Sequence, residues 1–185
     1  MKAYEKNYCH EKDALRSICI SVQTTGLNPE KDEILQISVI DGNGNVLLDT
    51  LVRPYFIKTW PDAESIHGIT PETVSHSIQL FELMPTLQRM IYSANSIIVY
   101  NKKFVMQFLG QAGIGLAQNH YYDVMIEFVK IYNDWNDYFG NYRYQSLTTC
   151  ANYYGLDFHT QNNLEKAHAI LHCYKKMIEN SDIQP

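Results

Sequence analysis

The fold of this chain is decided by the stretch Ile18-Cys19-Ile20-Ser21-Val22-Gln23-Thr24-Thr25-Gly26-Leu27. It begins as an apolar run of strand type, and Gly26 marks a turn at its end. We therefore expect a first strand that runs into a glycine turn, and such a turn presents backbone N–H groups. Ser21 and Gln23 stand two residues apart, which places both side chains on one face of the strand.

Two further strand-like runs follow, at residues 33–41 and 46–53, with Asp41-Gly42-Asn43-Gly44-Asn45 as a tight turn between them. Together the three runs predict an antiparallel meander. Beyond it, the chain alternates between helical spacing and short apolar runs. Helices are expected at 62–68, 71–74, 78–92, 104–113, 125–131, 145–154 and 164–178, and strands at 97–100 and 121–125.

Three features complete this outline. Thr70 is expected to cap the second of these helices, with Pro71 at its first position. Residues 135–144 are polar and aromatic, and they predict a loop. An antiparallel meander followed by alternating strands and helices predicts an α/β fold, a mixed sheet with helices on both faces.

The composition predicts a single domain. The chain has 185 residues, of which 45% are apolar, and this length and apolar content suit one compact core. We expect a lead-in segment at 1–16, the domain at 17–180 and a tail at 181–185. No run approaches the ~18 apolar residues that a membrane span needs, and the N-terminus lacks the apolar stretch of a signal peptide. We therefore expect a cytoplasmic protein.

Cysteine spacing and net charge exclude two simple classes of protein. Cys9, Cys19, Cys150 and Cys173 show no C-x-x-C spacing, so we expect reduced, mostly buried thiols rather than a zinc site or a disulfide framework. The formal net charge of −5 has the wrong sign for bulk electrostatic binding of nucleic acid, so any such binding is local. Fourteen tyrosines could serve as stacking platforms for bases or as core and protein-contact residues.

The opening stretch resembles the D-x-E-T-T-G-L motif of the DEDDh 3′–5′ exonucleases, the DnaQ-like and ribonuclease T-like family. The resemblance implies a ribonuclease-H-like fold with a mixed five-stranded sheet. It also implies that the two carboxylates of the motif hold two catalytic metal ions. Ser21 and Gln23 stand at those two positions, and neither side chain carries a charge.

Two later segments resemble the remaining motifs of this family. Tyr100-Asn101-Lys102-Lys103-Phe104-Val105 is similar to H-N-A-x-F-D, and Val105 stands at the aspartate position. Gln161-Asn162-Asn163-Leu164-Glu165-Lys166-Ala167 is similar to H-x-A-L-x-D-A. The resemblance places Gln161 at the general-base histidine and Lys166 at the last metal-binding aspartate. Shifting the register to use His159 as the base would put Leu164 at the aspartate position, so the site is not restored.

All five positions therefore lack the chemistry that the resemblance assigns to them. Cleavage of a phosphodiester with two metal ions requires gathered carboxylates, and Mg²⁺ prefers charged oxygen ligands. Glutamine cannot take a proton from water at neutral pH, and an ammonium competes with a cation. We expect a catalytically inactive pseudo-exonuclease that holds neither Mg²⁺ nor Mn²⁺.

Other parts of the motifs are present and suggest that nucleic acid is still bound. The candidates are Thr24, Thr25, Gly26, Leu27, His67 in the I-H-G-I-T loop at 66–70, Asn101, Lys102 and Lys166. Lys166 is of special interest, because its ammonium could occupy the space of a metal ion and contact a phosphate directly. The alternative is that these residues serve only the fold, with Lys166 as a surface lysine.

Three further features are weaker. His168 and His172 stand four apart on the last helix without a convincing third metal ligand. Asp123 is expected to cap the helix that follows it. Residues 138–144 interleave aromatic and basic side chains as single-strand binders do, although a protein contact fits equally well.

Three functions stay open at this stage. The chain binds ends of single-stranded DNA or RNA without cleaving them, or it is a protein-interaction or regulatory module that reuses the fold. A weak metal-dependent 3′–5′ exonuclease with non-standard ligands is the third hypothesis.

Overall fold

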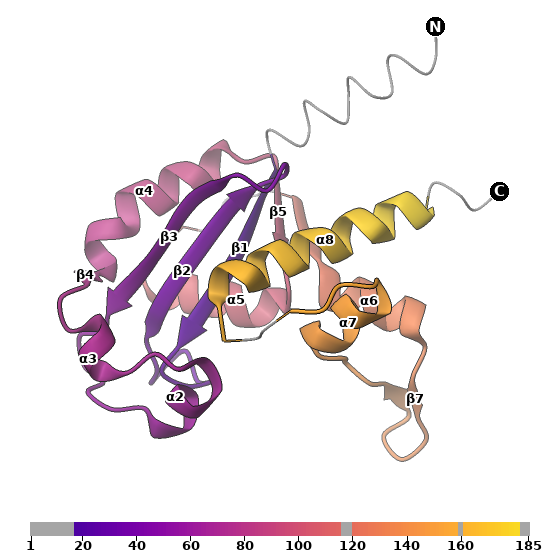
Figure 1. Ribbon diagram of the computed structural model, residues 1–185, viewed down its shortest axis with the longest axis horizontal. Coiled ribbons are helices and arrows are strands. Elements are labelled where there is room, and N and C mark those ends of the chain that lie inside the picture. The colour runs from indigo at the N-terminus through magenta and orange to yellow at the C-terminus, as the bar shows by residue number, and fades with distance from the viewer. Residues whose placement is uncertain (1–16, 116–119, 159–160, 182–185) are drawn as a thin grey trace, which may run out of the picture.

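The computed structural model describes residues 17–115, 120–158 and 161–181 (Figure 1). The expected lead-in segment at 1–16, with Cys9, lies outside these ranges, and so do His159 and residues 182–185 of the expected tail. No helix of the described ranges is long and apolar enough to cross a membrane.

A mixed sheet forms the centre of the molecule, with strand order β4-β3-β2-β1-β5-β6. Its strands are β1 (Ser17–Thr24), β2 (Ile34–Asp41), β3 (Val46–Arg53), β4 (Ile78–Gln79), β5 (Ser96–Val99) and β6 (His120–Asp123). The first three pair antiparallel, which confirms the predicted meander, and β5 and β6 extend the sheet in parallel beside β1.

The described sheet has six strands instead of the five expected, because β4 was missed. Residues 78–79 were predicted as the start of a helix. They pair in parallel with Val52 and Arg53 at the end of β3, and the helix begins only at Leu80. A two-residue strand is defined by its neighbour in the sheet and not by any periodicity of its own.

The helices follow the predicted order. They are α2 (Pro61–His67), α3 (Pro71–Val74), α4 (Leu80–Ser93), α5 (Lys102–Gln111), α6 (Val124–Tyr132), α7 (Leu147–Tyr153) and α8 (Asn163–Ser181). Thr70 caps α3 as expected, since its hydroxyl accepts a hydrogen bond of 3.2 Å from the amide of Thr73. Helix α4 passes through Pro85 without ending.

Helices cover both faces of the sheet, as Figure 1 shows for α8 in front and α4 behind. Ile18, Ile20 and Val22 of β1 point into one core with α4 and α5, whereas Cys19 points into a second core with α7 and α8. This alternation along β1 turns Ser21 and Gln23 toward α8. The predicted α/β fold with helices on both faces is therefore confirmed.

Two smaller predictions have different outcomes. Cys19, Cys150 and Cys173 are free and buried as expected, and burial raises the pKa of the Cys19 thiol well above its ordinary value. Residues 135–144 were predicted as a loop, but they form a hairpin of β7 (Trp135–Asn136) and β8 (Asn141–Tyr142). The hairpin escaped prediction because each strand has only two residues.

Candidate functional site

The first carboxylate position of the motif is occupied by a buried hydrogen-bond network. The Ser21 hydroxyl donates to Asn163 Oδ1 at 2.7 Å. The side-chain nitrogen Nδ2 of Asn163 donates in turn to the Ser21 carbonyl at 3.0 Å and to Ser38 Oγ at 2.7 Å. Ser21, Ser38 and Asn163 are 6%, 0% and 0% exposed. This network joins the first residue of α8 to strands β1 and β2.

The network continues outward to β3. Ser38 Oγ donates to the Asp49 carboxylate at 2.7 Å, and Gln36 Nε2 donates to the same oxygen at 3.0 Å. Asp49 thus closes the chain of hydrogen bonds at the exposed surface of the sheet, two strands away from Ser21. The Ser21 hydroxyl is therefore committed to a structural role.

Three other motif positions meet one another at the start of α8. Lys166 Nζ donates to Gln23 Oε1 at 3.3 Å, and Gln23 Nε2 donates to the carbonyl of Gln161 at a long 3.5 Å. The predicted register, which placed Gln23, Gln161 and Lys166 in one site, agrees with these contacts. The structure therefore brings together three residues that lie up to 143 positions apart in the chain.

Lys166 is a half-buried cation with a neutral partner. The ion pairs of the described residues are Lys130 with Glu127 and Lys176 with Glu179, so Lys166 has no acidic partner among them. Burial lowers the pKa of the Lys166 ammonium, because the charged form loses hydration. An ammonium in this setting lacks the counter-charge that a carboxylate or a bound anion would supply.

Val105, at the fifth position, lies on α5 and points into the core. It is 3% exposed and packs in the same cluster as Ile20, Val22 and Val99. A side chain in this place has no access to the contact between Gln23 and Lys166, and it has no ligand atom. The structure therefore does not bring Val105 together with the other four positions as a polar site.

The glycine turn after β1 is held by its own threonines. The Thr25 amide donates to the carbonyl of Glu33 at 2.8 Å, and the Thr25 hydroxyl donates to Asp32 at 3.1 Å. The Thr24 hydroxyl donates to the carbonyl of Gly26 at 2.6 Å. Both threonines are 7% exposed, so their side chains fix the turn.

Gly26 and Leu27 form the outer part of this turn. A Cβ at Gly26 would lie 2.5 Å from the Asp32 carboxylate, so the turn accepts no larger residue there without a shift. Leu27 is 83% exposed. Because the turn is fixed and the Leu27 side chain faces water, this side chain is available to pack against a bound molecule.

His67 supports the turn from the side. Its Nε2 donates to the carbonyl of Thr24 at 3.2 Å, and its Nδ1 accepts from the Ile69 amide at 3.1 Å. These partners assign the neutral tautomer with the proton on Nε2. Burial is the largest cause of its lowered pKa, and the Lys166 ammonium adds to the effect. Both ring nitrogens of His67 are hydrogen-bonded and the residue is 6% exposed. His67 therefore holds the loop at 66–70 to the end of β1.

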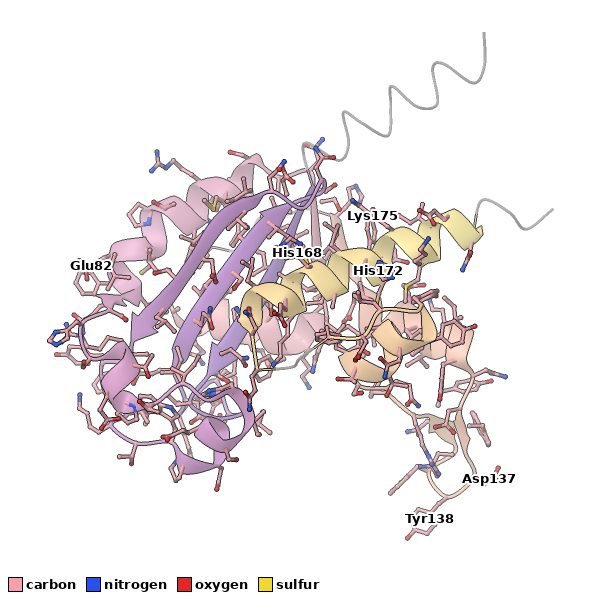
Figure 2. The ribbon with its side chains drawn as sticks, viewed as in Figure 1. Glu82, Asp137, Tyr138, His168, His172 and Lys175 are labelled. Atoms are coloured by element: carbon pink, nitrogen blue, oxygen red, sulfur yellow. The ribbon has the colours of Figure 1, made fainter. Side chains whose placement is uncertain are left out.

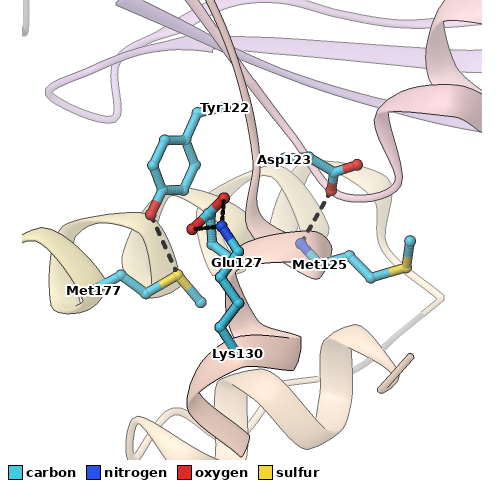
Figure 3. A network of polar contacts seen from close by, with 6 residues as sticks. All are labelled: Tyr122, Asp123, Met125, Glu127, Lys130 and Met177. Carbon is cyan, nitrogen blue, oxygen red and sulfur yellow. Dashed lines mark hydrogen bonds and ion pairs between the residues drawn. The ribbon is translucent and has the colours of Figure 1, made fainter. Parts of the chain in front are cut away.

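Asp123 caps two helices at the end of β6. Its carboxylate accepts from the Met125 amide at 3.1 Å, which confirms the predicted cap on the following helix (Figure 3). It also accepts hydrogen bonds from the backbone amides of Asn101 and Lys102 at 3.1 and 2.8 Å, so it caps the N-terminus of α5 as well. Asn101 adopts φ 61° as the N-cap of α5, and its side chain accepts from the amide of Phe104.

Lys102 is exposed and lines an open groove of about 800 Å³ between α5, the start of α6 and residues 29–30 of the loop that joins β1 to β2. Its ammonium lies 4.6 Å from the centre of the Tyr121 ring. The groove is lined by Pro29, Glu30, Lys102, Lys103, Met106 and Ile126, among others.

The two histidines of α8 gain no third ligand. His172 Nε2 lies 3.1 Å from the carbonyl of Tyr154, and His168 lies beside Gly44. Figure 2 shows both side chains along α8 with Lys175. Within the described ranges, no three His, Cys, Asp or Glu side chains gather as a metal site.

Sequence reasoning missed Asn163, which organises the site more than any predicted residue. One signal was available, because Ser38 is a small polar residue between the apolar Ile37 and Val39 and needs a buried partner. Which residue would supply that partner depends on how α8 crosses the sheet.

The donors at this site do not fit a pair of divalent cations. Two metal ions about 4 Å apart need several carboxylates, whereas these positions offer a bonded hydroxyl, two amides, a buried valine and an ammonium. Neutral amides beside a fixed positive charge cannot offset the repulsion between two such cations.

Similar folds occur in several exonucleases of known structure. Exonuclease X in complex with 5′-overhanging duplex DNA has a TM-score of 0.69 at 17% identity, covering 91% of this chain and 94% of that one. E. coli exonuclease I in complex with a dA16 oligonucleotide has a TM-score of 0.71 at 16% identity, covering 89% and 40%. A 3′-exonuclease that recognises the 3′-end of the histone mRNA stem-loop has a TM-score of 0.67 at 14% identity, covering 97% and 71%.

Sequence comparison gives the family. The uncharacterized exonuclease CP81 of Escherichia phage 186 is 33% identical over 88 residues, which are 47% of this chain and 43% of that protein. The matched part is thus less than half of this curated relative. A family model described as Exonuclease (RNase_T) matches residues 18–172. The chain therefore belongs to the RNase_T exonuclease family.

Proposed function

We propose that this chain is a non-cleaving member of the exonuclease family that binds the ends of single-stranded nucleic acid. One observation carries the proposal: the half-buried ammonium of Lys166 lies against the neutral Gln23 and has no acidic partner among the described residues. The ammonium stands where the family resemblance places a metal ligand.

The chemistry of the donors supports the absence of cleavage. Ser21 is bonded to Asn163, and Gln23 contacts an ammonium, so neither provides an anionic ligand. Gln161 has no proton-accepting nitrogen or carboxylate to activate a water molecule. A positive charge at Lys166 opposes the entry of further cations.

The charge of Lys166 supports the binding of a phosphate. A phosphate oxygen would give the ammonium a charge-assisted hydrogen bond, which is about twice as strong as a neutral one. The exposed Leu27 would pack against the terminal base at the same time. Such a site binds locally, in agreement with a net charge of −5.

The comparisons support nucleic acid as the ligand class. Two of the similar structures are complexes of exonucleases with DNA, and a third exonuclease recognises the end of an RNA stem-loop. At 14 to 17% identity these likenesses concern the fold, so the ligand of this chain has to be measured.

The test follows binding and degradation in one experiment. Labelled single-stranded DNA and RNA are incubated with the protein and Mg²⁺ or Mn²⁺ at low salt. We expect binding without shortening, and we expect Lys166→Glu to weaken binding because it reverses the charge at the phosphate. Lys175→Glu is the matched control, since it makes the same charge change at an exposed position of α8.

Two outcomes contradict the proposal in different ways. Shortening that needs the metal, stops with EDTA and is absent from a mock purification would show an active nuclease with unrecognised ligands. If neither DNA nor RNA binds at low salt, the chain is a protein-interaction module instead. Equal weakening by Lys166→Glu and Lys175→Glu would mean that net charge, and not the site, governs binding.

A further inference from the structure

Five large aromatic side chains lie exposed on the hairpin of β7 and β8, residues 134–145, which we call the aromatic arm. Figure 1 shows the arm projecting from the body of the molecule, and Figure 2 places Asp137 and Tyr138 at its tip. The exposed fractions are 49% for Trp135, 88% for Tyr138, 69% for Phe139, 43% for Tyr142 and 65% for Tyr144.

The backbone of the arm is held by its own polar groups. Asn136 accepts at its side chain from the amide of Tyr138 at 3.1 Å, and at its carbonyl from the amide of Gly140 at 2.9 Å. At the root, Gln145 Nε2 donates to Asp134 at 3.0 Å, and the Gln145 carbonyl accepts from the Tyr100 hydroxyl at 2.8 Å. The turn is therefore shaped without burying the rings at its tip.

We propose that the aromatic arm is the interface between two copies of this chain. With about 200 Å² for a large aromatic side chain, the five exposed fractions amount to roughly 600 Å² in each copy. Two arms packed together could bury at most about 1,200 Å² from these rings, which is the lower end of specific interfaces. Tyr132 and Tyr153 lie 6.1 Å apart beside the root, and both are exposed enough to extend the contact.

The charges of the arm suit an identical partner. Asp137 lies at the tip, whereas Arg143 lies near the root, where its amide donates to the carbonyl of Asp134. In a two-fold arrangement with antiparallel arms, the tip of each copy meets the root of the other. The Asp137 carboxylate of one copy then faces the Arg143 guanidinium of its partner, in both directions.

The same charges disfavour nucleic acid as the occupant. The arm carries Asp134 and Asp137 against the single cation Arg143. Since phosphate contacts supply most of the affinity for nucleic acid, a surface with two carboxylates and one guanidinium is poorly suited to it. Aromatic rings with a few charges of both signs are instead typical of the centre of protein interfaces.

The test measures the association of the full chain by sedimentation velocity from about 1 to about 100 µM. We expect a dimer whose dissociation constant rises roughly 100-fold in the double variant Tyr138→Ser, Phe139→Ser, because both rings are lost from both copies. Phe56→Ser and Phe81→Ser are the matched controls, with 77% and 64% exposure on another part of the surface. They should leave the dimer unchanged.

Charge reversal tests the antiparallel pairing. Asp137→Arg alone or Arg143→Asp alone should raise the dissociation constant roughly tenfold, and the two together should restore it within about threefold. Circular dichroism checks that each variant keeps the wild-type fold and melting temperature.

Several results would overturn the inference. The first is a wild-type chain that stays monomeric at the highest concentration, and the second is a dimer that persists when Tyr138 and Phe139 are both replaced by serine. The third is a weakening by Asp137→Arg or Arg143→Asp that the combined variant does not reverse. If the chain is monomeric and the double variant weakens oligonucleotide binding, the arm is a stacking platform for bases. Loss of dimerisation with intact oligonucleotide binding leaves the Lys166 proposal standing, so the two proposals fail separately.

Discussion

Replacing Asn163 with alanine should destabilise the protein far more than an asparagine substitution usually does. The side chain is 0% exposed and takes part in three hydrogen bonds, with the Ser21 hydroxyl, the Ser21 carbonyl and Ser38 Oγ. At about 1 kcal/mol each, their net loss costs about 3 kcal/mol. The Ser21 hydroxyl is also left buried without its acceptor, which adds about 1 to 2 kcal/mol.

We therefore expect the free energy of unfolding to fall by about 4 to 5 kcal/mol, a large fraction of the 5 to 15 kcal/mol typical of a domain. Urea unfolding followed by circular dichroism measures this change. With a slope of about 2 kcal/mol per molar urea, the midpoint should fall by about 2 M. Asn152→Ala is the control, because Asn152 is exposed on α7 and its change should stay within about 0.5 kcal/mol.

A double-mutant cycle separates the energy of the Ser21–Asn163 hydrogen bonds from the cost of the cavity that Asn163→Ala leaves. If Asn163 and Ser21 act together, Ser21→Ala should cost at least 1 kcal/mol less in the Asn163→Ala background than in the wild type. A loss below about 1 kcal/mol for Asn163→Ala, or additive effects in the cycle, would refute the claim that this network joins α8 to the sheet.

Three further predictions concern the same region. Gly26→Ala should lower the melting temperature by several degrees, since its Cβ would meet the Asp32 carboxylate at 2.5 Å; a melting temperature equal to the wild type contradicts this. The pKa of His67 is lowered in the folded protein, so the unfolded chain binds a proton at this residue more readily than the folded chain does. The free energy of unfolding is therefore highest above the ordinary histidine pKa of 6.5, and it falls as the pH drops below that value. Urea midpoints from pH 8 to pH 5 should therefore decline more steeply in the wild type than in His67→Gln, and equal slopes would count against the buried neutral ring. Millimolar Mn²⁺ should leave the melting temperature unchanged, because a formed two-metal site would raise it by mass action. An increase that EDTA reverses would reveal metal ligands other than the motif residues.

Much of the fold could be predicted because long elements carry their own periodicity. The apolar run at the start of β1 predicted a strand, and the two-residue spacing of Ser21 and Gln23 predicted that both side chains lie on one face. The structure places that face toward α8. The two-residue strands β4 and β7 could not be predicted, since their pairing depends on β3 and β8 and on no pattern within themselves.

The candidate site was predicted in part for a related reason. The motif register placed Gln23 and Lys166 in one site although they lie far apart in the chain, and the structure adds that their side chains are in contact. The role of Asn163 was missed, since its partners lie on two strands whose distance from α8 no local pattern encodes. The role of His67 was also missed, because its two partners are backbone groups of Thr24 and Ile69.

Ser21 and Gln23 are each bound to a neighbouring side chain, and these contacts argue against a metal site that a single change at either position could create. Aspartate at position 21 would set a carboxylate against Asn163 Oδ1 in a buried place. Asn163 could then donate to it only by turning its amide away from Ser38. A carboxylate at position 23 would pair with the Lys166 ammonium, so it would be neutralised before any metal arrived. Ser21 is held by Asn163 and Gln23 by Lys166, so the surroundings of Ser21 and Gln23 suit a fixed polar contact better than a metal ion.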